Sequence, residues 1–140
     1  MSTLIGVTLA LLVAAFARLT GFDRDRSFYP TVLVIVASYY VLFAVMGGGT
    51  RALFLESIVM AAFAAFAVKG FKGSVWLVVA GLAGHGVMDF FHGHIVTNPG
   101  VPEWWPAFCG AYDVVAAACL AWLIKVPART TLYSAPSEVR

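Results

Sequence analysis

The sequence predicts an all-α integral membrane protein, a bundle of five transmembrane helices with its amino terminus outside and its carboxyl terminus in the cytoplasm. Of its 140 residues, 61% are hydrophobic and 11% are charged, against roughly 45–50% and 25% in soluble globular domains. Five apolar stretches approach the ~20 residues that a helix needs to cross a bilayer. Nearly all basic residues fall at the ends of these stretches that would face one side of the membrane.

The five predicted spans form a single domain of residues 1–126. The first apolar stretch is interpreted as a retained helix and not as a signal peptide, because its basic residues follow it. The glycines at 47–49 are expected to reverse the chain, and further connections are expected at 69–74 and 97–105. The predicted spans are 3–19, 29–46, 51–68, 75–96 and 106–124, followed by a polar cytoplasmic tail at 127–140.

The charge distribution sets the predicted orientation. With five spans, Arg51 alone among the nine basic residues lies on the side of the amino terminus. Because Lys and Arg gather on the cytoplasmic side of membrane proteins, the amino terminus is expected outside, in a bacterial inner (cytoplasmic) membrane. The basic residues on the other side are Arg18, Arg24, Arg26, Lys69, Lys72, Lys125, Arg129 and Arg140.

One stretch of the fourth predicted span, 84–94, concentrates polar side chains inside an apolar helix. It contains all three histidines of the chain, together with Asp89. At ~100° per residue, His85, Asp89 and His92 fall within about 60° of one another, whereas His94 projects from nearly the opposite side. Since imidazole and carboxylate groups bind divalent transition metals, His85, Asp89 and His92 are predicted to be metal ligands.

Two further acidic residues are expected at a similar depth. Glu56 lies near the outer end of the third span and Asp113 lies within the fifth, so three helices place ionisable groups in the outer half of the bilayer. Such residues usually face the bundle interior and are functional. Either Glu56 or Asp113 could join the predicted metal ligands. Asp113 and Glu56 are also candidate catalytic residues, as general base when not bound to the metal, although Glu56 could instead pair with Arg51 or face a water-filled vestibule. Cys109 shares a face with Asp113 and is interpreted as a core residue in preference to a soft ligand.

Three hypotheses explain these residues, and the sequence leaves them open. In the first, a divalent transition metal, with Zn or Fe favoured, activates water in a metal-dependent hydrolase of a lipid or other amphiphile from the outer leaflet. In the second, the same groups relay protons or gate an ion path. In the third, their hydrogen bonds only fix helix packing. Haem is an alternative cofactor, with His85 or His92 as its axial ligand.

The order of the motifs also carries a resemblance. The His/Asp-rich stretch precedes a Trp104-Trp105-Pro106 turn and a Tyr112-Asp113 pair. In this the chain resembles a family of small bacterial polytopic membrane proteins with five helices, which implies the fold but no activity. In chemistry alone, the residues are similar to those of ceramidase-like intramembrane zinc hydrolases. Five short helices make a thin bundle, so a homo-oligomer is expected, whereas no basic, aromatic-interleaved surface suggests a nucleic-acid partner.

Overall fold

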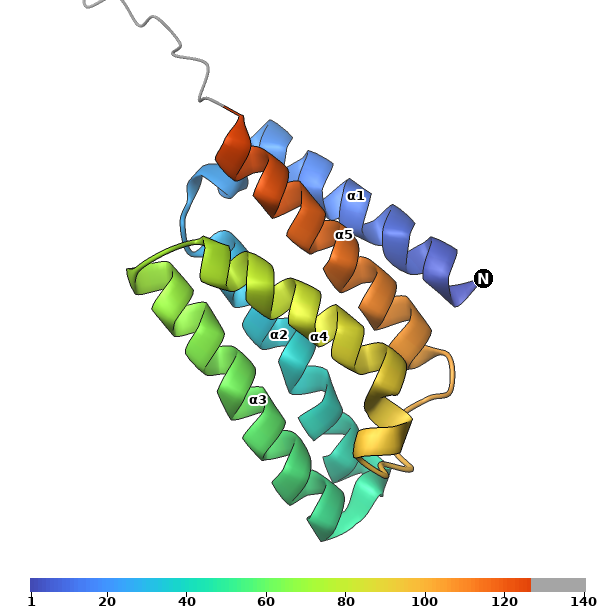
Figure 1. Ribbon diagram of the computed structural model, residues 1–140. Coiled ribbons are helices and arrows are strands. Elements are labelled where there is room, and N and C mark those ends of the chain that lie inside the picture. Colours follow the sequence, from blue (N-terminus) through green and yellow to red (C-terminus); the bar gives the residue numbers. More distant parts are fainter. Residues whose placement is uncertain (127–140) are drawn as a thin grey trace, which may run out of the picture.

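The computed structural model describes residues 1–126, which fold into helices joined by short connections (Figure 1). These residues contain no strand, which confirms the predicted all-α class. The predicted tail at 127–140 lies outside the described residues. The helical segments are α1 (Ser2–Thr20), a 3-10 turn η1 (Phe22–Arg24), α2 (Phe28–Phe43), a π-helical turn η2 (Ala44–Gly48), α3 (Gly49–Lys72), α4 (Trp76–Ile95) and α5 (Trp105–Lys125).

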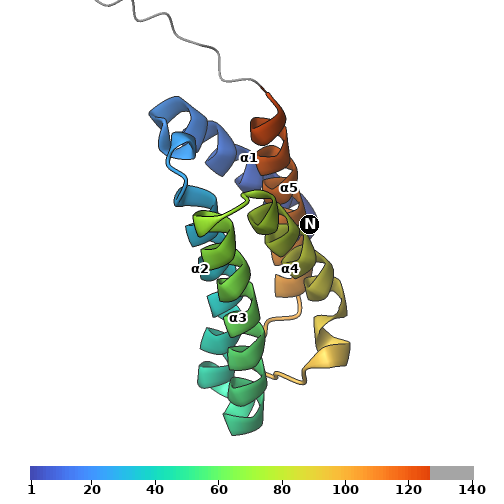
Figure 2. The same ribbon diagram turned by 60° about the vertical axis from the view of Figure 1, so that its left-hand side comes forward.

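The helices run alternately in opposite directions and lie side by side in a bundle (Figures 1 and 2). α5 packs against both α1 and α4, while α3 packs against both α2 and α4. The apolar core lies among α2, α4 and α5, around Leu33, Val78, Leu82 and Leu120. α4 contacts α2, α3 and α5, so the polar stretch of the sequence lies on the central helix of the bundle.

Three segments of residues 1–126 are long and apolar enough to cross a membrane, namely Ser2–Thr20, Phe28–Lys72 and Trp105–Lys125. The second contains both α2 and α3, because helical residues follow one another without a gap while the chain reverses between the two helices (Figure 1). α4 is not among these segments, and its histidines and Asp89 lower its hydropathy. Apolar helices of membrane-spanning length are therefore present, whereas the count of five spans and the orientation of the termini stay predictions.

The connections differ in detail from the expected ones. The chain does reverse at the glycines 47–49, where Gly49 has a φ of 78°, in the left-handed region that favours glycine. The helical turn before it is π-helical, so α2 does not simply end at the first glycine. The expected loop at 69–74 is shorter, because α3 continues to Lys72.

Two glycines set the distance between α4 and α5. A Cβ atom added to Gly86 would lie 2.9 Å from the carbonyl oxygen of Gly110, and one added to Gly110 would lie 2.9 Å from the carbonyl oxygen of Gly86. Since real Cβ atoms do not approach so closely, the backbones can meet here only because both residues are glycine. The side chains that flank this contact include Asp89 and Asp113, so the close approach brings the acidic residues of two helices together.

Candidate metal centre

Four potential metal ligands from α4 and α5 meet inside the bundle. His85 and Asp89 lie four residues apart on α4, and Cys109 and Asp113 lie four residues apart on α5, so each pair shares one helix face. Each residue offers one ligand atom, and these atoms all lie within 4.8 Å of one another. All four side chains are buried. These four residues are referred to below as the α4–α5 cluster.

His85 makes the shortest contact of the α4–α5 cluster. Its Nδ1 atom lies 2.6 Å from Oδ2 of Asp113 and 3.6 Å from Oδ2 of Asp89. The thiol of Cys109 donates to the same Asp113 oxygen over 3.7 Å. Within the α4–α5 cluster, three buried atoms have no hydrogen-bond partner among the described residues, namely His85 Nε2, Asp89 Oδ2 and Asp113 Oδ1. Buried polar atoms are nearly always paired, so the cluster has unused capacity to bind an ion.

A second buried polar group consists of Glu56, His92 and Asn98. His92 Nε2 lies 2.8 Å from Glu56 Oε1, and the side-chain amide of Asn98 donates to the same oxygen over 3.0 Å. Asn98 also donates to the main-chain carbonyl oxygen of Tyr40 over 3.2 Å, which ties the connection after α4 to α2. The structure thus pairs Glu56 with His92 and Asn98, and not with Arg51.

Tyr40 lies between the two polar groups. Its hydroxyl donates to Oδ1 of Asp89 over 2.7 Å, and its ring stacks on that of His92 with a centroid separation of 4.0 Å. The Tyr40 side chain is fully buried. It therefore fixes the orientation of the Asp89 carboxylate and joins the α4–α5 cluster to the second group.

We expect Tyr40→Phe to lower the free energy of unfolding by about 1–2 kcal/mol, because it leaves Oδ1 of Asp89 buried without its donor. The matched control is Tyr39→Phe, since the neighbouring side chain is 37% exposed. Thermal unfolding of both variants in detergent would measure the difference. Equal losses in the two variants would show that the hydroxyl of Tyr40 does not stabilise the site.

The predicted ligand set is only partly brought together. His85 and Asp89 belong to the α4–α5 cluster, but His92 lies outside it, against Glu56. The reason is axial distance, because seven residues place His92 about 10 Å further along the helix than His85. Asp113, expected as a general base, lies among the potential ligand atoms. His94 is exposed, as its opposite direction on the helix predicts.

For two residues, the sequence gives weaker evidence that they belong to the site. Cys109 does pack in the apolar core, as expected, but it also contacts Asp113. Its spacing of four residues from Asp113 repeats the spacing of His85 and Asp89, and this repetition is the signal that favours a ligand. Asn98 has no comparable signal, because its partners Tyr40 and Glu56 are distant in the sequence.

No protein-family model, curated protein or solved structure matches this chain. The resemblance inferred from the order of the motifs therefore stays a prediction.

The donor set of the α4–α5 cluster suits a transition metal. It combines an imidazole, a thiol and two carboxylates, and all three ligand types bind Zn²⁺ at about 2.0–2.3 Å. The four ligand atoms already lie within 4.8 Å of one another, so small side-chain movements would bring each of them to such a distance from a central ion. The cluster could therefore hold a metal ion. Haem needs more space, and neither His85 nor His92 lines the apolar cavity of about 810 Å³ in this structure.

Proposed function

We propose that this protein is a membrane-embedded metal-binding protein and that the metal serves an enzyme activity on a lipid or other amphiphile. The observation that carries the proposal is the α4–α5 cluster, with four ligand atoms from two helices buried within 4.8 Å of one another. Carboxylates inside a membrane are costly and are normally paired. A divalent cation would offset this cost by placing positive charge among them.

The proposed ion is Zn²⁺ or Fe²⁺, with His85, Asp89, Cys109 and Asp113 as the residues that hold it. A thiolate favours zinc, whereas imidazole and carboxylate accept either metal. When bound, such an ion polarises a carbonyl or phosphoryl oxygen and activates water. Catalytic zinc sites have three protein ligands and one open position, so a catalytic site here uses three of these four residues.

The second polar group is proposed to handle protons. Glu56 and His92 share a hydrogen bond of 2.8 Å, and a carboxylate–imidazole pair can pass a proton between its two members. Glu56 thus keeps its predicted role as general base. His92 changes from a predicted ligand to the partner of that base, and Asp113 changes from a predicted base to a ligand.

We place the chain in a bacterial cytoplasmic membrane, crossing it five times with the amino terminus outside. The alternating helix directions bring the carboxyl ends of α1, α3 and α5 to one end of the bundle (Figure 1). Arg26 donates at the same end to the carbonyl oxygen of Gly70 over 3.5 Å. The last turns of these helices contain the basic residues Arg18, Lys69, Lys72 and Lys125. Because basic residues gather on the cytoplasmic side of membrane proteins, we propose that this end of the bundle faces the cytoplasm. The homo-oligomer stays a prediction.

Elemental analysis of protein purified in mild detergent tests the proposal. We expect near-stoichiometric zinc or iron in the wild type and in His92→Ala, because His92 lies outside the α4–α5 cluster. Cys109→Ser should bind zinc at least about tenfold more weakly, since a thiolate is a much better zinc ligand than a hydroxyl. Both variants alter one buried side chain near the site, so each controls for the other.

Folded wild type that neither contains metal nor takes it up would refute the metal proposal. In that case the hydrogen bonds among Tyr40, Asp89, His85 and Asp113 favour the proton relay. A pH-driven proton flux into liposomes, absent from empty liposomes, would then be the decisive measurement.

A further inference from the structure

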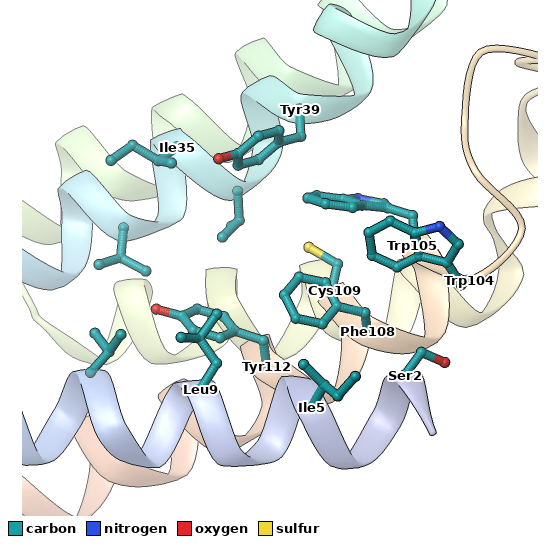
Figure 3. Close-up of a pocket in the computed structure, with 13 residues that line it drawn as sticks. Ser2, Ile5, Leu9, Ile35, Tyr39, Trp104, Trp105, Phe108, Cys109 and Tyr112 are labelled. Atoms are coloured by element: carbon teal, nitrogen blue, oxygen red, sulfur yellow. The ribbon is translucent and has the colours of Figure 1, made fainter.

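An apolar cavity of about 810 Å³ lies between α1 and α2, with α5 forming its remaining wall (Figure 3). It forms because α1 packs against α5, whereas α2 packs against α3 and α4. The cavity is partly open and its lining is almost entirely apolar. Its volume is in the range of roughly 300–1,000 Å³ that is usual for small-molecule sites.

The shape of the cavity follows the helices. Ser2, Ile5, Leu9 and Val13 line it from α1, and these residues lie on one helix face. From Ser2 to Val13 the helix rises roughly 16 Å, about half of the ~30 Å thickness of a hydrocarbon core. The cavity therefore has the length of one bilayer leaflet.

One end of the cavity carries the groups typical of a membrane interface. Ser2 and Trp104 lie together at this end, beside Trp105 (Figure 3). The ring of Trp105 also lines the cavity, whereas its Nε1–H is buried out of reach of a molecule there. Tryptophan side chains gather at the membrane interface, the level at which the polar group of an amphiphile lies.

The cavity and the α4–α5 cluster share one residue. Cys109 lines the cavity, with its sulfur directed into it (Figure 3), and its thiol also lies 3.7 Å from Oδ2 of Asp113. His85, Asp89 and Asp113 do not line the cavity. Cys109 is thus the point at which a molecule in the cavity meets the candidate metal centre.

We infer that the cavity binds the single hydrocarbon chain of an amphiphile, such as a long-chain ester or amide, with its polar group at the end that carries Ser2 and Trp104. Three features identify this occupant: an apolar lining, a length of one leaflet, and serine and tryptophan side chains at the interfacial end. The inference names the substrate class of the proposed enzyme and in that respect rests on the proposed function. Binding of the chain itself requires no metal.

Quenching of tryptophan fluorescence by a dibrominated long-chain methyl ester tests the inference. The reporter is full-length protein in micelles with Trp105 as its only tryptophan, because Trp76, Trp104 and Trp122 are changed to Phe. We expect saturable quenching, before and after treatment with a chelator. The pair Leu9→Phe and Val13→Phe fills the cavity and should weaken binding at least about tenfold. The control pair, Leu4→Phe and Leu12→Phe, lies on the exposed surface of α1 and should leave binding unchanged.

Quenching that rises linearly with the ester and is equal in the filled and control pairs would overturn the inference, since it would show only partitioning into micelles. Metal content measured on the same samples separates the two proposals. Saturable binding to protein that cannot take up metal would refute the proposed metal function and leave the cavity inference standing. Metal in the protein without saturable binding of the ester would refute the cavity inference and leave the proposed metal function standing.

Discussion

Asp113→Asn should lower the affinity for metal by at least about tenfold, because even residues that only hydrogen-bond to metal ligands are worth 10–100-fold in metal binding. Asp113 holds a central place in the α4–α5 cluster. Its Oδ2 atom accepts from the Cys109 thiol and lies 2.6 Å from His85 Nδ1, and its Oδ1 atom is buried without a partner. Asparagine keeps the size of the side chain but removes its charge, so the loss reports ligation and not packing. A competitive titration against a chromophoric chelator would measure it.

Glu56→Gln is the matched control for Asp113→Asn. Glu56 is likewise a buried acid in contact with a histidine, but its partner is His92 and it lies outside the α4–α5 cluster. We expect Glu56→Gln to keep its metal. If Asp113→Asn also kept its metal and lost only activity, Asp113 would return to the role of general base that its position in the sequence suggests.

Gly86→Ala should lower the free energy of unfolding by about 1–3 kcal/mol, the range for overpacking in a close-packed interface. The added methyl group would lie 2.9 Å from the carbonyl oxygen of Gly110, 3.0 Å from Cγ2 of Val114 and 3.2 Å from Cβ of Asp113. The backbone oxygen cannot move without shifting α5, so the two helices must separate. We therefore expect thermal unfolding at a lower temperature together with weaker metal binding.

Gly84→Ala separates the effect of packing from that of helix propensity. The nearest atom to its added methyl group would be Cε1 of Phe63 at 3.9 Å, an ordinary contact distance. Since alanine is up to about 1 kcal/mol better than glycine inside a helix, this variant should be slightly more stable than the wild type. If both variants shifted in the same direction, the close approach of α4 and α5 would not depend on Gly86.

The fold class could be predicted because composition and apolar length are properties of the sequence alone. Apolar runs of nearly 20 residues leave few alternatives to helices in a lipid environment. The helix ends were harder to predict. α3 continues to Lys72 because lysines are good helix formers whose side chains can reach water from the last turn. From the sequence alone, the charges of Lys69 and Lys72 favour a loop at this position.

The candidate site could be predicted within a helix but not between helices. Helical periodicity correctly put His85, Asp89 and His92 on one buried face. It could not show that α5 meets this face at the level of His85, because that depends on the contact between Gly86 and Gly110. Nor could it show that Asn98 would meet Glu56, because the chain must fold before these residues approach each other. Hence periodicity alone groups His92 with ligands from which it is separated along the helix axis.

The division of the α4–α5 cluster between two helices has a consequence for how the protein is made. α4 is the helix that falls short of the apolarity of a spanning segment, and it carries His85 and Asp89 into the bundle. During synthesis it leaves the ribosome before α5, which supplies Cys109 and Asp113. Asp89 can therefore meet Tyr40 of α2 before α5 has been made. Completion of the α4–α5 cluster is then a late event in folding that depends on α5.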